Sequence, residues 1–588
     1  MTRHKVNTPN RRDALERLGA IHNVDVLIVG AGINGAGSFR DLCLNGVTCL
    51  IVDREDFGAG ATNASSRIAH GGLRYLETGQ LRLVAEATLE RNRLLQNAPH
   101  YVKPLLITIP SFSRFGGVLA SVGKLFGKAR SMPTRGVALV KTGLVIYDWL
   151  GRKQRSLPFH RVDGRRSALA ILPDINPSIA GISSYYDARI THTERLAFEL
   201  IEAGLAANPA SLAINHVALC GFRGGRVLLR DDCEGTEFTV HPKIVVNAGG
   251  AWIDDVNSLM GQRDHLIGGT KGSHVMVENE TLRQAMGGRA FSFDDGDGRM
   301  CVAYEAFGLV MLGTSDIRVA HADDATCSNE EIAYFLDKIR IVFPKIEVKR
   351  DEVKYAFVGV RPLPQAPAGA TVNISRDHSF KRHDPTTDRP FPILSLIGGK
   401  WTTFRAFSEQ TADRVLAELK RHRTRSTAAL PIGGGRDYPR GPGEPQAWIE
   451  REARAAGMET GRMRVLFERY GTTARIVAPF CCQAGGEAPL LGATDYSEGE
   501  IRYLLQREMA VSVLDVVTRR TTLALEGALS LPLLRQLARI ILEESGVQDP
   551  SPAVIDGIVV PALAYFTGRN AVYSLVGAGE TATLSGQA

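Results

Sequence analysis

The chain has 588 residues, of which 44% are hydrophobic; this is enough for a large core and predicts roughly two to four structural units. The net charge of +7 is modest for this length, so it favours an anionic substrate or an anionic membrane surface and does not indicate a nucleic-acid partner. The eight cysteines include no Cys-x-x-Cys pair, which excludes the usual metal-ligand spacing, predicts no metal site and is typical of a reducing compartment.

We expect residues 1–21 to form an N-terminal extension with a short helix from Arg11 to Leu18. This stretch is charged and lacks the apolar centre of a secretory signal. No run of about 18 or more apolar residues occurs, so we expect no membrane-spanning helix. The sequence therefore predicts a cytoplasmic protein and leaves peripheral membrane attachment open.

A strand–turn–helix–strand pattern over residues 24–53 is the strongest local signal. An apolar run enters the motif Gly30-x-Gly32-x-x-Gly35, and a second apolar run ends in Asp53. The glycines permit a tight turn, close approach of a pyrophosphate and close helix–strand packing, and an acid at position 53 can bind an adenosine ribose. The pattern predicts a dinucleotide site rather than a merely tight turn, and by itself it leaves FAD and NAD both open.

The next elements are a glycine-rich loop over 54–80 and a helix from about Leu81 to Asn97. The simplest interpretation of the charged residues on this helix is a solvated face, formed by Glu86, Glu90, Arg91 and Arg93.

Residues 114–147 mix cations with large apolar side chains. The basic part, 114–141, is typical of an amphipathic surface helix and equally typical of an interfacial membrane anchor.

Glycine-rich turns follow two later strands. A buried strand over 241–247 runs into Gly249, and residues 397–404 form a second glycine-rich element that leads into a helix ending near Leu419. Residues 421–443 look like a linker, and 446–588 read as mostly helical, with helical apolar spacing over 500–519 and 530–545.

Six sequence blocks occur together along the chain. The blocks are Gly30–Gly37, His70–Glu77, Lys271–His274, Leu312–Asp316, Gly359–Leu363 and Gly398–Thr403. In this order they resemble the FAD-dependent (aerobic, quinone-linked) glycerol-3-phosphate dehydrogenase family. The resemblance covers about residues 22–420 and continues into the C-terminal segment.

The resemblance implies an α/β fold: an FAD-binding Rossmann-like domain of the glutathione-reductase and D-amino-acid-oxidase type, a mixed-sheet substrate domain and a C-terminal helical domain. The expected boundaries are 22–113, 185–270 and 356–420 for the FAD-binding domain, 114–184 and 271–355 for the substrate-binding cap, 421–445 for the linker and 446–588 for the helical domain.

The resemblance also implies a reaction. The enzyme would oxidise sn-glycerol 3-phosphate to dihydroxyacetone phosphate by hydride transfer from C2 to flavin N5, and electrons would pass to a membrane quinone. The protein would lie peripherally on the inner face of the cell membrane and contact its lipid surface. Whether it forms a homodimer is left open.

The expected FAD ligands come from the βαβ motif, from a serine-rich loop that resembles the family's FAD loop, and from the later glycine-rich turns. They are Gly30, Gly32, Asn34, Gly35, Asp53, Ser65, Ser66, Arg67, His70, Gly249, Gly399 and Thr402. His70 could equally be a core histidine, and the serine-rich loop rests on the resemblance alone.

A phosphorylated substrate needs several fixed cations, because a phosphate dianion is best held by charge-assisted hydrogen bonds. Arg74, Arg361, Arg376 and Lys400 stand at positions that resemble the family's phosphate-binding set. Each alone could be an ordinary surface cation. Around them, Tyr75 is expected to bind substrate or pack beside the flavin, and Thr314 and Asp316 to orient substrate hydroxyls or form a turn.

Oxidation at C2 also requires that the hydroxyl proton leave, so a base is expected near the substrate. His274 is the first candidate, with a structural histidine as the alternative. Lys400 is the rival base, because a lysine among other cations loses its proton more easily.

Three alternatives remain. Tyr304-Glu305 stands where the family usually has Pro-Trp, so the substrate could be a longer polyol phosphate such as erythritol phosphate. Oxygen could replace quinone as acceptor. A non-catalytic flavin-binding protein is a further class, and it is disfavoured because the cations and the base are all present.

Overall fold

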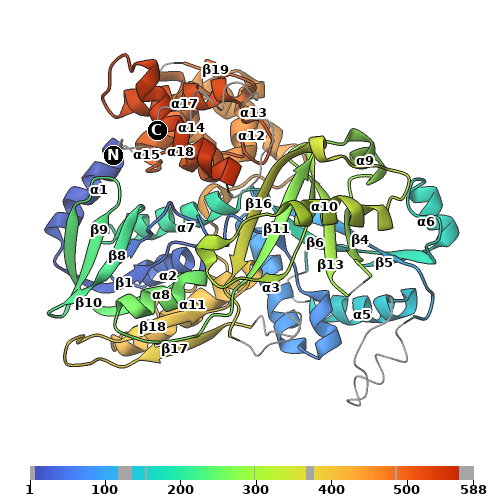
Figure 1. Ribbon diagram of the computed structural model, residues 1–588, viewed down its shortest axis with the longest axis horizontal. Coiled ribbons are helices and arrows are strands. Elements are labelled where there is room, and N and C mark those ends of the chain that lie inside the picture. Colours follow the sequence, from blue (N-terminus) through green and yellow to red (C-terminus); the bar gives the residue numbers. More distant parts are fainter. Residues whose placement is uncertain are drawn as a thin grey trace.

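The computed structural model describes residues 7–116, 135–152, 155–296, 298–365, 377–483 and 486–568. Figure 1 shows two large sheets side by side, with a helical domain formed by the C-terminal part of the chain, from Glu444 onward, above the first of them. In the described residues, no helix is both long enough and apolar enough to cross a bilayer.

The first sheet is the dinucleotide-binding type. Strand β1 lies at its centre in parallel pairing with β2 and β10, while β7 and β18 extend it in parallel on either side. Edge strand β17 and the β8–β9 hairpin pair antiparallel. The strands are β1 (Asn23–Val29), β2 (Cys49–Val52), β7 (Leu212–Ile214), β8 (Val217–Arg223), β9 (Arg226–Asp231), β10 (Glu237–Asn247), β17 (Ser379–His383) and β18 (Ile393–Ile397).

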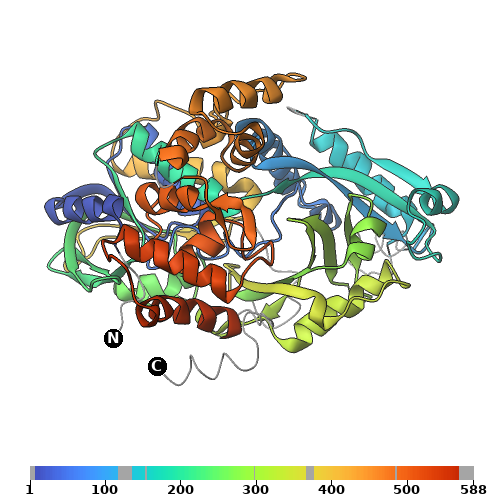
Figure 2. The same cartoon turned by 90° about the horizontal axis from the view of Figure 1, so that it is seen from above.

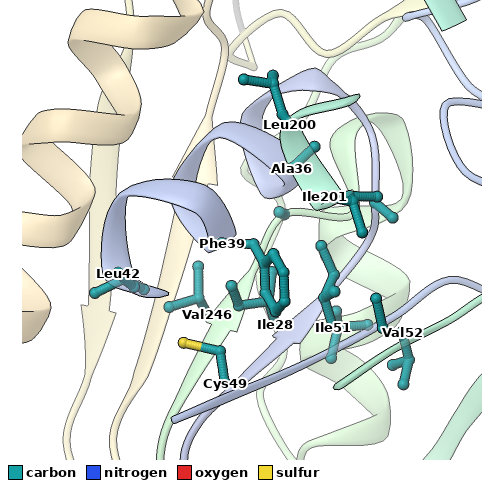
Figure 3. Packing of buried hydrophobic residues seen from close by; sticks show 14 of the residues in the cluster. Ile28, Ala36, Phe39, Leu42, Cys49, Ile51, Val52, Leu200, Ile201 and Val246 are labelled. Atoms are coloured by element: carbon teal, nitrogen blue, oxygen red, sulfur yellow. The ribbon is translucent and has the colours of Figure 1, made fainter. Parts of the chain in front are cut away.

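Helices cover this sheet because its central strands are apolar on both faces, as buried parallel strands are. Figure 3 shows Phe39 packed among Ile28, Ile51 and Val246. The helices that belong to this domain are α2 (Ile33–Leu44), α7 (Thr193–Ala207), α8 (Ile253–Leu259) and α11 (Phe404–Glu418). The Rossmann-like prediction is confirmed.

The second sheet is mixed, and it forms the floor of the other half of the molecule. Its order is β15-β11-β14-β13-β12-β4-β6-β3, with β16 beside β11 and β5 beside β6. Only β12 and β4 pair in parallel. The strands are β3 (Ile68–Ala69), β4 (Val102–Ser111), β5 (Arg161–Gly164), β6 (Gly181–Ile190), β11 (Thr270–Val277), β12 (Ala290–Asp294), β13 (Met300–Ala306), β14 (Leu309–Gly313), β15 (Ile317–Arg318) and β16 (Val353–Arg361).

Within the described residues, four helices accompany the second sheet, and helix α3 joins this sheet to α11 of the first domain. Helix α3 spans Leu81–Asn97, as the sequence predicts. The others are α5 (Val137–Leu150), α6 (Arg165–Ile171), α9 (Glu280–Ala285) and α10 (Asn329–Lys338). Residues 117–134, the middle of the basic segment, lie outside the described residues.

Strand pairing places β4 and the end of β16 differently from the expected domain boundaries. Strands β4 and β6 form the longest ladder of the second sheet, although β4 falls within the expected FAD-binding segment 22–113. Strand β16 pairs along β11, so residues 356–361 also belong to this sheet. A sequence pattern identifies a strand without its partner, and for this reason it does not assign a strand to one of two sheets.

The C-terminal domain is mostly helical, as expected. It contains α12 (Glu444–Ala456), α13 (Thr460–Tyr470), α14 (Ala474–Gln483), α15 (Glu498–Arg507), α16 (Val513–Asp515), α17 (Leu531–Glu544), α18 (Pro552–Gly568) and the short hairpin of β19 (Pro489–Leu490) and β20 (Ala493–Ser497). The helical apolar spacing over 500–519 belongs to several short helical segments rather than to one continuous helix. Helix α15 ends at Arg507, Met509 has positive φ, and a π-helical turn over Val516–Arg520 follows α16.

The N-terminal helix and the expected linker are both tied to the first domain. Helix α1 (Pro9–Ala20) contains the predicted Arg11–Leu18 helix, and buried Arg11 forms an ion pair with Asp231 at 2.6 Å. In the linker segment, Arg423 pairs with buried Asp41 of α2 at 2.6 Å. These segments are therefore bound to the domain surface rather than loose connections.

Candidate cofactor and substrate site

A cavity of about 1040 Å³ lies between the two sheets. One end is lined by Asp53 and by the β7–β8 connection, and the other by His274, Arg361 and Lys400. The glycine motif after β1 lines the wall between these ends. This places the cavity at the carboxyl ends of β1 and β2, where open α/β sheets bind their ligands.

The glycines of the motif are required by close backbone contacts. Gly30 has φ +102°, and a Cβ on it would lie 2.5 Å from the carbonyl oxygen of Ala248. A Cβ on Gly35 would lie 1.9 Å from the carbonyl oxygen of Gly30. Helix α2 begins directly after Gly32, and Gly32, Ile33 and Asn34 line the cavity, so the N-terminus of the helix lies at the wall where an anion site is expected.

Asp53 follows β2 and lines the cavity. Its carboxylate accepts hydrogen bonds from the N–H groups of Ala31 at 2.7 Å and Glu55 at 3.0 Å. Burial raises the pKa of Asp53 to about 6 in spite of these donors. The acid is thus fixed beside the glycine turn, where a ribose hydroxyl can reach it.

The loop that contains Ser65, Ser66 and Arg67 forms another part of the wall. The guanidinium of Arg67 is engaged by the protein, in a buried ion pair with Glu194 and a 3.0 Å hydrogen bond to the carbonyl of Thr191. Thr62, which the sequence analysis missed, accepts a hydrogen bond from the N–H of Ile33 at 2.9 Å and joins this loop to α2.

The Tyr304-Glu305 pair does not form part of the substrate-binding wall of the described cavity. Among the described residues neither side chain lines the cavity. The Tyr304 hydroxyl donates to the carbonyl of Ser66 at 3.0 Å, and Glu305 pairs with Arg283 at 3.0 Å. Tyr304 therefore supports the cofactor loop, and the argument from this pair to a longer substrate loses its basis.

Arg361, at the end of β16, is held in a fixed orientation at the substrate end. Its guanidinium donates to Asp316 at 3.1 Å, to Thr314 Oγ1 at 2.9 Å, to the Ser315 carbonyl at 3.1 Å and to the Lys271 carbonyl at 3.3 Å. A Cβ on Gly272 would lie 2.2 Å from the guanidinium, so the glycine is what lets the arginine lie flat on β11.

His274 is buried and lines the same end of the cavity. Its ring stacks on Phe357 with centroids 5.0 Å apart, and neither ring nitrogen has a hydrogen-bond partner among the described residues. Burial and then the positive charges of Arg361 and Arg67 lower the pKa of His274 to about 3. A neutral imidazole with open nitrogens at a cavity wall can accept a proton.

Lys400 reaches the cavity from the turn between β18 and α11. Its Nζ lies 3.6 Å from the centroid of the Tyr75 ring, and both residues line the cavity. Gly399 has φ +95°, and a Cβ there would approach Asn34 Nδ2 to 3.1 Å. The Thr402 hydroxyl accepts a hydrogen bond from the N–H of His70 at 3.1 Å, which joins the two turns.

Several expected residues lie elsewhere. Arg74 donates to the carbonyl of Gly298 at 3.2 Å and does not line the described cavity. Thr314 and Asp316 hold Arg361 rather than forming the wall. Arg376 lies outside the described residues. Gly35 does not line the cavity either, because it packs against the backbone of Gly30. The other expected ligands, including Gly249, line it.

Residues from the C-terminal domain also line the cavity, which no motif indicated. They are Ser512, Leu514, Asp515, Arg519, Ile558 and Tyr565, among others. No motif indicated that Trp252 lines the cavity either. The guanidinium carbon of Arg54 lies 4.7 Å from the centroid of the Trp252 ring.

The residues present fit a flavin dinucleotide. A cradle that excludes Cβ atoms, a helix N-terminus and an acid form one half of a single cavity, and a neutral histidine and cations from another sheet form the other half. Fold and site together define a flavin-dependent oxidoreductase.

Comparison with known proteins supports the assignment to the flavin-dependent oxidoreductases. The family described as FAD dependent oxidoreductase matches residues 25–376, and the C-terminal domain of alpha-glycerophosphate oxidase matches residues 425–550. The chain belongs to the FAD-dependent glycerol-3-phosphate dehydrogenase family, and its cofactor is FAD.

Individual relatives cover most of the chain. A glycerol-3-phosphate dehydrogenase of Synechocystis sp. is 30% identical over 85% of this chain and 89% of its own length. A D-erythritol 1-phosphate dehydrogenase of Brucella abortus is 28% identical over 84% and 94%. The structure of the Bacillus halodurans glycerol-3-phosphate dehydrogenase complexed with FAD has a TM-score of 0.72 at 21% identity, covering 97% of this chain and 99% of that one.

Proposed function

We propose that this protein oxidises sn-glycerol 3-phosphate at C2 to dihydroxyacetone phosphate and passes the electrons to a membrane quinone. The observation that carries the proposal is the meeting of Arg361, Lys400 and a neutral His274 at one end of the dinucleotide cavity.

Arg361 and Lys400 supply the positive charge that a phosphate dianion needs. Arg361 supplies a positive charge whose position is fixed by four protein acceptors, so this charge is in place for the phosphate without first having to be ordered. Lys400, fixed over Tyr75, adds a second charge from the opposite turn.

His274 is placed to accept the C2 hydroxyl proton. When bound, FAD supplies the acceptor for the hydride. The buried histidine is held neutral by its surroundings, so it is available as a base at neutral pH. The proton that it receives places a positive charge near Arg361, which makes its release favourable once the product leaves.

An anaerobic absorption titration tests the reaction. We expect sn-glycerol 3-phosphate to bleach the oxidised flavin band of the holoenzyme, and the Arg361→Ala variant to need a much higher concentration because a charge-assisted phosphate contact is lost. The Asp13→Asn variant, altered at an exposed site on α1, is the control and should titrate as the parent does.

The same titration separates the alternatives. Erythritol phosphate is tested in parallel because of the Brucella abortus relative, and bleaching by this compound alone would transfer the proposal to the longer polyol phosphate. Adding oxygen or a soluble quinone to the reduced enzyme then identifies the acceptor. Failure of both phosphates to bleach the flavin would contradict the proposed reaction.

We also propose that helix α5 and its flanks contact an anionic lipid surface, which would bring the enzyme to its quinone. Trp149 and Val145 on α5 are 59% and 51% exposed, and Phe159 is 72% exposed. Arg152 stacks on Trp149 and Arg155 on Phe159, so the exposed rings are bordered by cations. Figure 1 shows α5 at the edge of the molecule, on the opposite side from the C-terminal domain.

Vesicle flotation tests this surface. The double variant Trp149→Ser and Phe159→Ser should lose binding to vesicles that contain anionic lipid, while retaining its flavin and its turnover with a soluble acceptor. Ile476→Ser removes an equally exposed apolar side chain from α14 and serves as the control. Equal flotation of the double variant and the control would contradict the assignment of the surface.

A further inference from the structure

Glu331 is a buried carboxylate that lies behind the substrate end of the cavity. It is 5% exposed and belongs to the first turn of α10. It does not line the described cavity, so it has no direct contact with a substrate there.

Four donors converge on this carboxylate. Oε1 accepts from the Ser273 hydroxyl at 2.8 Å and the Ser315 hydroxyl at 2.5 Å. Oε2 accepts from Lys271 Nζ at 2.7 Å and from the N–H of Ser328 at 3.0 Å. Burial alone would raise the pKa of Glu331, but these hydrogen bonds lower it, so the group stays ionised.

The donors come from the elements that hold Arg361. Lys271 and Ser273 are on β11, and Ser315 belongs to the loop after β14. The Ser315 hydroxyl also accepts from the N–H of Ser273 at 2.9 Å, which closes the connection between strand and loop. Glu331 thus ties strand, loop and helix together at one point.

Arg361 rests on the backbone of these same residues. Its guanidinium donates to the carbonyls of Lys271 and Ser315, and also to Thr314 and Asp316 on either side of Ser315. A displacement of the 314–316 loop relative to β11 would therefore move the acceptors that aim the guanidinium.

We infer that Glu331 is a positioning residue for the substrate phosphate, acting through Ser315 and Lys271 on the orientation of Arg361. This inference rests on the proposed function, because it assumes that Arg361 binds the phosphate. Glu331 affects binding of the phosphate and takes no part in the proton step at His274.

The Glu331→Gln variant tests the inference. The glutamine amide accepts hydrogen bonds only at its oxygen, whereas both carboxylate oxygens of Glu331 accept them. At least two of the four donors therefore lose their acceptor, while the volume of the side chain is nearly unchanged. We expect the KM for sn-glycerol 3-phosphate to rise about tenfold, with kcat changed less than about twofold. Glu330→Gln alters an exposed carboxylate in the same helical turn and should leave both constants unchanged.

Two further readouts distinguish positioning from general damage. The Kd of inorganic phosphate for the oxidised holoenzyme, measured by calorimetry, should rise in Glu331→Gln by a factor similar to that of KM. The kcat/KM for unphosphorylated glycerol should stay unchanged, because that substrate makes no use of Arg361. A loss that is equal for glycerol and for the phosphate would overturn the inference in favour of a structural role.

A double-mutant cycle separates this inference from the proposed function. If Arg361→Lys leaves the phosphate constants unchanged, the proposed function fails. If Arg361→Lys raises KM but Glu331→Gln does not, only the role of Glu331 fails. If each single variant raises KM, the KM of the double variant should rise much less than the product of the two single increases, because both substitutions act on one contact.

Discussion

His274 combines burial, a lowered pKa and open ring nitrogens, and each follows from its place on β11. Strand β11 lies between β14 and β16, so the ring is enclosed by Gly313 on one side and by Phe357 on the other. Burial, together with the positive charges of Arg361 and Arg67, therefore disfavours the protonated imidazole and lowers the pKa of His274 to about 3.

The neutral state of His274 makes stability depend on pH. In the unfolded chain a histidine takes up a proton near pH 6.5, whereas the folded protein resists until about pH 3, so the unfolded state binds more protons in this window. Stability contributed by this site is thus lost as pH falls through 6.5, by roughly 1–2 kcal/mol between pH 7 and pH 5.

The measurement is the melting temperature of parent and His274→Asn apoprotein over this range. We expect the variant to lose less stability than the parent on acidification. His321→Asn replaces an exposed histidine and should follow the parent curve. Parallel curves for parent and His274→Asn would show that the residue is protonated normally in the folded state.

Helix α3 illustrates what a sequence pattern can and cannot determine. Its bounds were predicted because helical apolar spacing is local. The expectation that its charged face is solvated is wrong for Glu90 and Arg91, which are 2% and 4% exposed. Glu90 accepts two hydrogen bonds from Arg405 of α11, at 2.7 and 2.9 Å, and Arg91 pairs with Asp187 of β6 at 2.6 Å.

These ion pairs join α3 to both halves of the molecule, and we expect their disruption to be costly. Glu90→Gln leaves the buried guanidinium of Arg405 without its main counter-charge and should reduce the free energy of unfolding by about 3–5 kcal/mol. Glu409→Gln removes the more exposed partner of the same arginine, 2.8 Å away, and should cost clearly less. Chemical denaturation of the two variants measures the difference, and equal losses would contradict this ranking.

The same limit explains which parts of the site could be predicted. The glycine cradle and Asp53 lie in a short motif whose spacing carries the chemistry, whereas Arg361 and Lys400 were expected only from the family resemblance. The roles of Thr314 and Asp316 as supports of Arg361 depend on the pairing of β11 with β16, and Arg405 is 315 residues from Glu90. Such partners are selected by the three-dimensional packing, and a single sequence contains no local signal for them.

On the scale of the whole molecule, a buried charge cluster fixes the C-terminal domain to the first domain. Arg520 donates to Asp56 through both terminal nitrogens, at 2.7 and 2.9 Å, and Asp515 pairs with His216 at 3.0 Å. Helix α1 joins the same region, since Asn10 donates to the carbonyl of Arg507 at 2.9 Å. Figure 2 shows α1 and the C-terminal helices at the same end of the molecule.

We expect this cluster to control retention of the cofactor, because Asp515 and Arg519 line the cavity from the C-terminal side. Asp56→Asn removes the counter-charge of a fully buried arginine and should cost about 3–5 kcal/mol of stability and a large part of the bound flavin. Asp556→Asn breaks the more exposed pair with Arg535 inside the C-terminal domain and is the matched control.

Flavin absorbance per mole of purified protein, together with the melting temperature, decides the question. Full flavin content in Asp56→Asn would show that the cavity holds FAD without help from the C-terminal domain. A fall in both quantities that exceeds the effect of Asp556→Asn would support the coupling.

The pairing of Asp56 with Arg520 also determines when the enzyme can mature in the cell. The two residues are 464 positions apart, so at a synthesis rate of about 5–20 residues per second the arginine follows the aspartate by roughly half a minute to a minute and a half. During that interval the nascent chain already carries the glycine cradle, but one wall of the cavity has not yet been synthesised. We therefore expect flavin to be captured after translation has passed Arg520, and a product terminated before that residue would carry the dinucleotide motif without this wall of the coenzyme cavity.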